Sequence, residues 1–298
     1  MPAQLIDGKA LSASIRDHVA TEVARLKSNR MAVHLAAILV GDNPAAKVYA
    51  ENQTRTCAQV GIEYSLLLLP ESITQQELHA TLVRLNEDES ITGIMVHMPL
   101  PPHLNPQEIQ YGIDVLKDVE GVNPANIGQV VYGQTIIAPA TALAAVECVE
   151  ATGFTIAGSE AVVVGASRIA GKPIALLLTE RGATVTLCHI LTRDVAAHTS
   201  KADIVVVAVG RPNLIGKNHI KPGAVVIDVG INRITSTDAA GNALHKTVGD
   251  VNFAEVSQIA SHITPVPGGV GPMTVAMLLK NTLRAAKLVY RLENPFTK

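Results

Sequence analysis

The sequence contains no tryptophan, and aromatic residues of all kinds make up only 3% of its 298 residues. Proteins that bind single-stranded nucleic acid stack bases on aromatic side chains, so this scarcity argues against such a module. The core is expected to be aliphatic, as it is in buried parallel sheets. The formal net charge is only −2, from 24 basic and 26 acidic residues, which disfavours a surface for nucleic acid or anionic membranes.

Cysteine is also scarce, because Cys57, Cys148 and Cys188 are too few and too scattered for a disulfide framework or a cysteine-based zinc site. The histidines show no pair at ligand spacing with acidic partners, so no metal is predicted. No stretch reaches about 20 uninterrupted apolar residues, and the first residues, MPAQLIDGKALS, lack the pattern of a signal peptide. We therefore expect a cytoplasmic protein with no membrane partner.

Apolar runs alternate with helix-period segments almost throughout, which predicts parallel strands covered by helices. In the first half, we expect strands at 34–41, 63–70 and 92–100, and helices at 7–27, 43–61 and 74–88. A second strand-and-helix series begins near residue 160, and a periodic helix follows from residue 271. The predicted fold class is α/β, with two α/β lobes and a cleft between them.

The segment AVVVGASRIAGKP (161–173) places glycine and small residues where a strand turns into a helix. Backbone N–H groups and the positive helix end favour a phosphate at such a turn. The segment is not the standard GxGxxG, since only Gly165 and Gly171 are present, and Pro173 excludes a P-loop. From these residues alone, a nucleotide site and a plain strand-to-helix turn are equally good interpretations.

Six further segments carry distinctive patterns: VGDNPAAKVY (40–49), HMPLPPHL (97–104), KDVEGVNPANIG (117–128), PGAVVIDVGIN (222–232), GDVNF (249–253) and TPVPGGVGPMTVAMLL (264–279). Together they resemble the bifunctional methylenetetrahydrofolate dehydrogenase/methenyltetrahydrofolate cyclohydrolase family, in order and over essentially the whole chain. The resemblance implies a folate-binding catalytic domain (1–140 plus 273–298) and a Rossmann-like NAD(P)-binding domain (141–272). It also implies a homodimer that acts in folate one-carbon metabolism.

Several residues within these segments depart from the family pattern. The family has Tyr-x-x-x-Lys on a helix, where this chain has Tyr49 and Gln53, and His97 stands where the family has glutamine. The resemblance implies that the tyrosine stacks on the folate, that the lysine drives the cyclohydrolase step, and that Glu120 replaces an aspartate that holds the pterin. The catalytic candidates are Tyr49, Gln53 and His97, and the substrate-binding candidates are Tyr49, Glu120, Pro267, Gly268, Gly271 and Thr274.

These departures affect the two family reactions differently. Hydride transfer from the methylene carbon is assisted by the folate nitrogens and needs close placement against the nicotinamide. Hydrolysis of the methenyl product needs a group that activates water, and Gln53 cannot titrate. The sequence therefore predicts a dehydrogenase with weak or absent cyclohydrolase activity. His97 has two interpretations: a hydrogen-bonded residue at a strand end, or an acid/base group for a relocated hydrolysis.

The cofactor candidates are Gly165, Ala166, Ser167, Ile190 and Ile231. In the family, an arginine at the position of Ala166 and a serine at that of Ile190 contact the 2′-phosphate of NADP. A phosphate dianion beside apolar side chains is costly, so we expect NAD to be preferred over NADP. The alternative is that Arg168 and Arg193, which lie close in sequence, bind the 2′-phosphate instead. The combined departures leave two alternatives open: another folate-dependent one-carbon transfer or reduction, or a non-catalytic folate binder.

Overall fold

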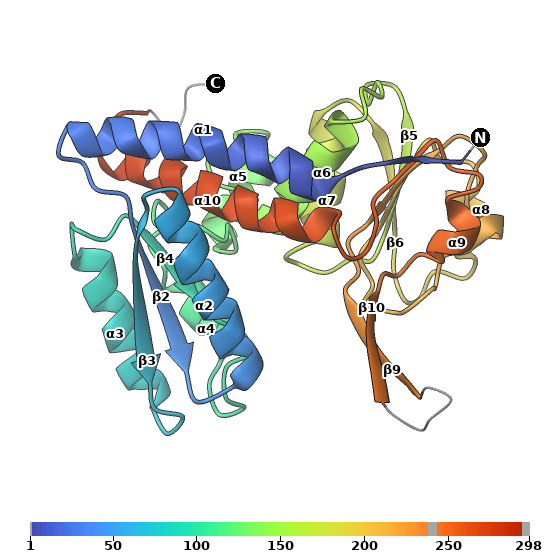
Figure 1. Cartoon of the computed structure of the whole chain (residues 1–298). Coiled ribbons are helices and arrows are strands. Elements are labelled where there is room, and N and C mark those ends of the chain that lie inside the picture. Colours follow the sequence, from blue (N-terminus) through green and yellow to red (C-terminus); the bar gives the residue numbers. More distant parts are fainter. Residues whose placement is uncertain (1, 238–242, 294–298) are drawn as a thin grey trace. The chain divides into compact units, whose positions relative to one another are not determined.

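The structure, a computed structural model, describes residues 2–237 and 243–293 and has the predicted α/β class (Figure 1). The chain divides into two compact units: unit 1 comprises Met1–Ala13 and Thr141–Met277, and unit 2 comprises Ser14–Ala140 and Leu278–Lys298. The sequence-based boundaries placed residues 1–13 and 273–277 in the first domain, but both segments group with unit 1. Residues 1–13 do so through β1 (Gln4–Leu5), which pairs in parallel with β11 (His262–Ile263). Residues 294–298 of the predicted first domain lie outside the described residues.

Unit 2 is built on a parallel sheet with the strand order β3-β2-β4. Its strands and helices are β2 (His34–Val40), α2 (Pro44–Gln59), β3 (Glu63–Leu69), α3 (Gln75–Glu87), β4 (Gly93–Val96), α4 (Pro106–Tyr111) and α5 (Pro124–Val131). The central strand β2 is buried at every position after His34, as expected for a strand with sheet neighbours on both sides and helices over its faces. The predicted strand and helix segments of this half are therefore confirmed, with shorter strand ends.

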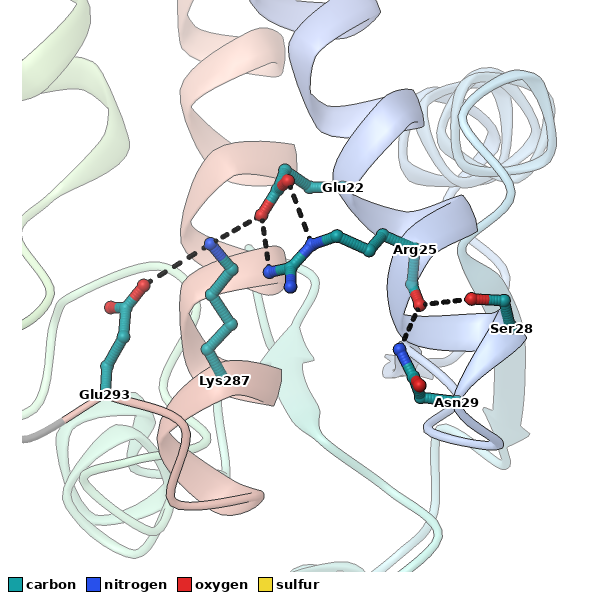
Figure 2. Close-up of polar contacts among 6 residues, drawn as sticks. All are labelled: Glu22, Arg25, Ser28, Asn29, Lys287 and Glu293. Carbon is teal, nitrogen blue, oxygen red and sulfur yellow. Dashed lines mark hydrogen bonds and ion pairs between the residues drawn. The ribbon is translucent and has the colours of Figure 1, made fainter.

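The long helices α1 (Gly8–Ser28) and α10 (Val270–Val289) are joined within unit 2 by an ion network (Figure 2). Glu22 accepts hydrogen bonds from Arg25 at 3.2 and 3.1 Å, and Lys287 Nζ lies 2.9 Å from Glu22 and 3.4 Å from Glu293. The hydrogen bond from Arg25, and then that from Lys287, lowers the pKa of the Glu22 carboxyl to about 2. A single exposed ion pair contributes little to the free energy of unfolding, but here one carboxylate is shared by cations from both helices.

Unit 1 contains a larger parallel sheet with the strand order β1-β11-β8-β7-β5-β6 (Figure 1). Its remaining elements are α6 (Ala140–Glu150), β5 (Glu160–Val164), α7 (Gly171–Glu180), β6 (Thr184–Cys188), α8 (Val195–Thr199), β7 (Ile204–Val207), a 3-10 turn (Lys217–His219), β8 (Val225–Asp228) and α9 (Phe253–Val256). Valines from adjacent strands, including Val162, Val205 and Val226, form an aliphatic core. This sheet, with helices in its crossovers, is the predicted Rossmann-like domain.

The sequence did not predict the antiparallel hairpin of β9 (Asn232–Thr237) and β10 (Ala243–Val248) in unit 1. Its strands are short and rich in polar residues, so they lack the apolar runs that identify the buried strands. Over residues 2–237 and 243–293, no helix combines the length and apolar character needed to cross a membrane.

Candidate active site

Tyr49, Gln53 and His97, the three catalytic candidates, come together in unit 2. Tyr49 and Gln53 lie one turn apart on α2 and so share a face of that helix, while His97 directly follows β4. The ring centroids of Tyr49 and His97 are 5.7 Å apart, and the two rings meet edge-on at 82°. His97 and Gln53 are only 3% and 5% exposed, whereas Tyr49 is 45% exposed. Tyr49 is therefore the member of this group that offers an aromatic face to a ligand.

Tyr64, on β3, joins Gln53 to His97 and was not identified from the sequence. Its hydroxyl donates to Oε1 of Gln53 over 3.3 Å and lies 3.2 Å from Nε2 of His97. A phenol has a single proton, so when that proton is donated to Gln53, the phenol oxygen must accept from His97. His97 then carries its proton on Nε2, and the chain of donors runs from His97 through Tyr64 to Gln53.

The Gln53–Tyr64–His97 chain is neutral near pH 7. Burial lowers the pKa of His97 and raises that of Tyr64, and the amide of Gln53 does not titrate. The other end of that amide, Nε2 of Gln53, is buried and has no hydrogen-bond partner among the described residues. An unpaired buried donor costs on the order of 1–3 kcal/mol, which a ligand acceptor would offset.

Glu120 lies on a turn that the buried carboxylate of Asp118 holds in place. Asp118 accepts hydrogen bonds from the backbone N–H groups of Gly121 and Asn123 at 3.1 and 2.8 Å. The side-chain amide of Asn126 donates to it at 2.9 Å. Gly121 has φ +68°, and a Cβ there would lie 2.3 Å from the carbonyl carbon of Ala138, so only glycine fits. The turn is thus fixed by buried contacts.

The carboxyl group of Glu120 titrates near neutral pH. Burial, and then the charge of Asp118, raises its pKa to about 7, although the N–H of Val96 donates to it over 3.5 Å. The pKa of Tyr49 is raised mainly by burial and also by the charge of Glu120. Glu120 therefore acts within electrostatic range of Tyr49, and its ionised form can accept hydrogen bonds from the N–H groups of a ligand.

In unit 1, Gly165, Ala166 and Ser167 form the turn between β5 and α7. Gly165 has φ +114°, and a Cβ at this position would lie 2.2 Å from the carbonyl oxygen of Ala208. A Cβ on Gly171 would lie 1.8 Å from the carbonyl oxygen of Gly165. The close backbone approach requires both glycines, and the turn leads into the first turn of α7. These residues fit the pyrophosphate of a dinucleotide, which binds against such a turn.

The other two cofactor candidates also follow strands of this sheet. Ile190 comes after β6 and is 91% exposed, and Ile231 comes after β8 and is 66% exposed. Because the strands are parallel in the order β8-β7-β5-β6, both residues and the turn after β5 lie at the same edge of the sheet. The carboxyl ends of parallel strands are where doubly wound folds bind dinucleotides.

Pro267, Gly268 and Gly271 line a cavity of about 170 Å³ in unit 1, together with Ile231 and Lys9. Thr274 does not line this cavity. Its Oγ1 lies 3.2 Å from the carbonyl oxygen of Val270, to which it donates in the first turns of α10. The structure thus gathers Pro267, Gly268 and Gly271 around one cavity, whereas Thr274 lies further along α10.

Two buried carboxylates near this cavity, Asp228 and Asp250, were not singled out from the sequence. Asp228 lines the cavity and accepts hydrogen bonds from the N–H groups of Gly230, Asp250 and Val251. Asp250 accepts hydrogen bonds from the N–H groups that follow β7 and from the side chain of Asn232. Burial raises the pKa of Asp228 to about 6. The pair therefore holds together the loops that follow β7 and β8.

A Rossmann-like domain with a glycine-dependent phosphate turn is typical of nicotinamide-dependent oxidoreductases, and unit 2 adds a polar site beside an exposed aromatic ring. The chain belongs to the tetrahydrofolate dehydrogenase/cyclohydrolase family. The model of that family's catalytic domain matches residues 6–120, and the model of its NAD(P)-binding domain matches residues 139–290.

Similar proteins span nearly the whole chain. The bifunctional protein FolD of Acetivibrio thermocellus is 46% identical over 97% of this chain and 98% of its own length. A structure of the bifunctional FolD dehydrogenase/cyclohydrolase from Campylobacter jejuni is 44% identical, with a TM-score of 0.90 over 96% of this chain and 99% of that one. The Trypanosoma brucei enzyme, solved with NADP and an inhibitor, is 38% identical, with a TM-score of 0.90 over 98% and 99%.

Proposed function

We propose that this chain is an NAD-preferring 5,10-methylenetetrahydrofolate dehydrogenase with weak or absent methenyltetrahydrofolate cyclohydrolase activity. Membership of the family supports the substrate class, and the resemblance favours a homodimer. The observation that carries the proposal is the neutral Gln53–Tyr64–His97 chain, in which Gln53 stands where the resemblance implies a catalytic lysine. Hydride transfer does not require that lysine, whereas hydrolysis does.

The folate is bound by the exposed ring of Tyr49 and by the carboxylate of Glu120. A pterin is a flat heterocycle with several N–H donors on one edge, so it suits an aromatic face on one side and an anionic acceptor at its rim. Glu120 carries one methylene more than the aspartate of the family pattern, and the turn held by Asp118 fixes where that longer side chain starts.

The dehydrogenase step makes few demands on acid/base chemistry. A bound nicotinamide would supply the hydride acceptor, and the adjacent folate nitrogens would stabilise the cation that develops. The residues of the site hold the folate in the orientation that hydride transfer requires. Hydrolysis of the methenyl product is different, because water must lose a proton as it attacks. Gln53 cannot accept that proton, and Nε2 of His97 is already committed to Tyr64.

Ala166 and Ile190 support the preference for NAD. A 2′-phosphate beside these apolar side chains would gain none of the charge-assisted hydrogen bonds that favour a phosphorylated cofactor. Ile190 is almost fully exposed and follows β6, the strand next to β5 in the sheet. The Trypanosoma brucei relative was solved with NADP, so the family also accommodates the phosphorylated cofactor.

The dehydrogenase assignment is tested by mixing the purified chain with methylenetetrahydrofolate and either NAD or NADP. We expect growth of reduced-nicotinamide absorbance with both, and a larger kcat/KM with NAD. Absence of turnover together with folate-dependent thermal stabilisation would instead indicate a folate binder. A larger kcat/KM with NADP would contradict the cofactor preference.

Glu120 is expected to give the dehydrogenase a characteristic pH dependence. Only the ionised carboxylate accepts hydrogen bonds from the pterin, so kcat/KM should rise with pH through the pKa of about 7 and level off above it. Glu120→Gln should remove this rise and lower kcat/KM at pH 8 by roughly 10- to 100-fold, since hydrogen bonds to charged groups contribute about 1.5–3 kcal/mol. Rates measured from pH 5.5 to 9 check both effects.

Glu120→Asp is the matched control, because it keeps the charge and restores the residue of the family pattern. It should retain the pH-dependent rise and most of the activity. A Glu120→Gln variant that still shows the rise would assign it to another group and contradict the role of Glu120.

A further inference from the structure

Tyr64 connects two side chains that both depart from the family pattern. Its hydroxyl donates to Oε1 of Gln53 at 3.3 Å and lies 3.2 Å from Nε2 of His97. Gln53 is 5% exposed, and its Nε2 has no partner among the described residues. The amide is thus held at its oxygen end and unsatisfied at its nitrogen end, in the site where Tyr49 offers a ring to a ligand.

We propose that Tyr64 is a positioning residue for the folate substrate: it holds the Gln53 amide by its oxygen, so that Nε2 donates to an acceptor on the bound heterocycle. The inference rests on the proposed function, since it takes the ligand of this site to be a reduced folate. Such a heterocycle carries a carbonyl oxygen and ring nitrogens that can accept a hydrogen bond from a neutral amide.

The anchoring matters because the terminal torsion of a glutamine side chain rotates easily, and two opposite orientations of the amide are about equally favourable. Without Tyr64, the amide could turn its oxygen toward the ligand as readily as its nitrogen, and binding would have to select one orientation. Because the phenol proton is donated to Gln53, the phenol oxygen accepts from Nε2 of His97, and this sets the direction of the chain. Tyr64 therefore acts on the substrate through Gln53.

The test is Tyr64→Phe, which removes the hydroxyl and keeps the ring. We expect the KM for methylenetetrahydrofolate to rise roughly tenfold, as for the loss of one well-placed hydrogen bond, while kcat stays within about twofold. In a Gln53→Ala background, the same change should add no further rise in KM, because its effect passes through the missing amide. Independent rises of the full size in both backgrounds would overturn the proposal.

Tyr290→Phe is a matched control within unit 2, because the Tyr290 hydroxyl donates to the carbonyl oxygen of Ala32 at 2.8 Å. It removes a bonded tyrosine hydroxyl whose partner is not a residue of the candidate site, and it should leave KM unchanged. An equal rise in KM in both variants would show that the effect of Tyr64→Phe comes from a general loss of stability, and this would overturn the proposal.

Calorimetric binding of 5-formyltetrahydrofolate separates this inference from the proposed function. Wild-type protein that binds the probe but does not oxidise methylenetetrahydrofolate would refute the dehydrogenase assignment alone. Weaker binding by Tyr64→Phe would then still support the role of Tyr64, and binding equal to that of the wild type would overturn it. Wild-type protein that does not bind the probe would refute both.

Discussion

Replacing Gln53 with lysine is expected to raise the rate of methenyltetrahydrofolate hydrolysis by roughly 10²–10⁴-fold, the range that a positioned acid/base group contributes. Position 53 is almost completely buried, and burial lowers the pKa of a lysine, so a neutral amine would be present near pH 8. That amine can take the proton that water loses as it attacks the methenyl carbon. The loss of methenyl absorbance, followed for the wild type and the variant, measures the gain.

Gln53→Met is the control for this gain, because methionine has a similar length and volume and does not titrate. It should hydrolyse the methenyl substrate no faster than the wild type. Wild-type hydrolysis as fast as that of Gln53→Lys would show that another group already activates water, and His97 would then be the first candidate.

The second large effect is expected at the cofactor. Combining Ala166→Arg with Ile190→Ser should shift the ratio of kcat/KM for NADP to that for NAD by roughly 10- to 100-fold in favour of NADP. A guanidinium and a hydroxyl would supply the charge-assisted hydrogen bonds that the 2′-phosphate lacks, and such bonds contribute about 1.5–3 kcal/mol. Initial rates at varied NAD and NADP concentrations give the ratio directly.

Leu191→Ser is the matched control for the Ile190 change, since Leu191 is the next residue and is 80% exposed. It adds the same hydroxyl at a neighbouring position and should leave the ratio unchanged. A shift as large as that of the double variant would mean that general polarity of this loop, rather than a contact at 166 and 190, decides the preference.

The sequence predicted much of the fold, because the buried strands are apolar runs and the helices follow amphipathic periods. It also predicted that Tyr49 and Gln53 share a helix face, which depends only on their spacing. The hairpin of β9 and β10 escaped prediction because its strands are polar. Residues 1–13 group with unit 1 through the pairing of β1 with β11, a contact between distant segments that local patterns do not encode.

The side chains of the site that the sequence did not predict also depend on contacts between distant segments. Tyr64 lies in a strand whose sequence is typical of ordinary core. Its partners reach it only through the tertiary structure: Gln53 lies on α2, which packs on β3, and His97 follows β4, which lies beyond β2 in the same sheet. Asp118 and Asp228 lie inside recognisable segments, but they accept hydrogen bonds from backbone N–H groups, and no side-chain pattern reveals such contacts. The motifs pointed to Gln53 and His97, and the structure showed that Tyr64 connects them.

The most direct measurement is a time course of the wild-type chain with methylenetetrahydrofolate and NAD that records reduced nicotinamide and methenyl product in one sample, under conditions in which spontaneous hydrolysis is slow. We expect the two products to appear together in equal amounts and the methenyl product to accumulate. Reduced nicotinamide that rises while methenyl is consumed to 10-formyltetrahydrofolate would contradict a dehydrogenase that has lost its cyclohydrolase activity.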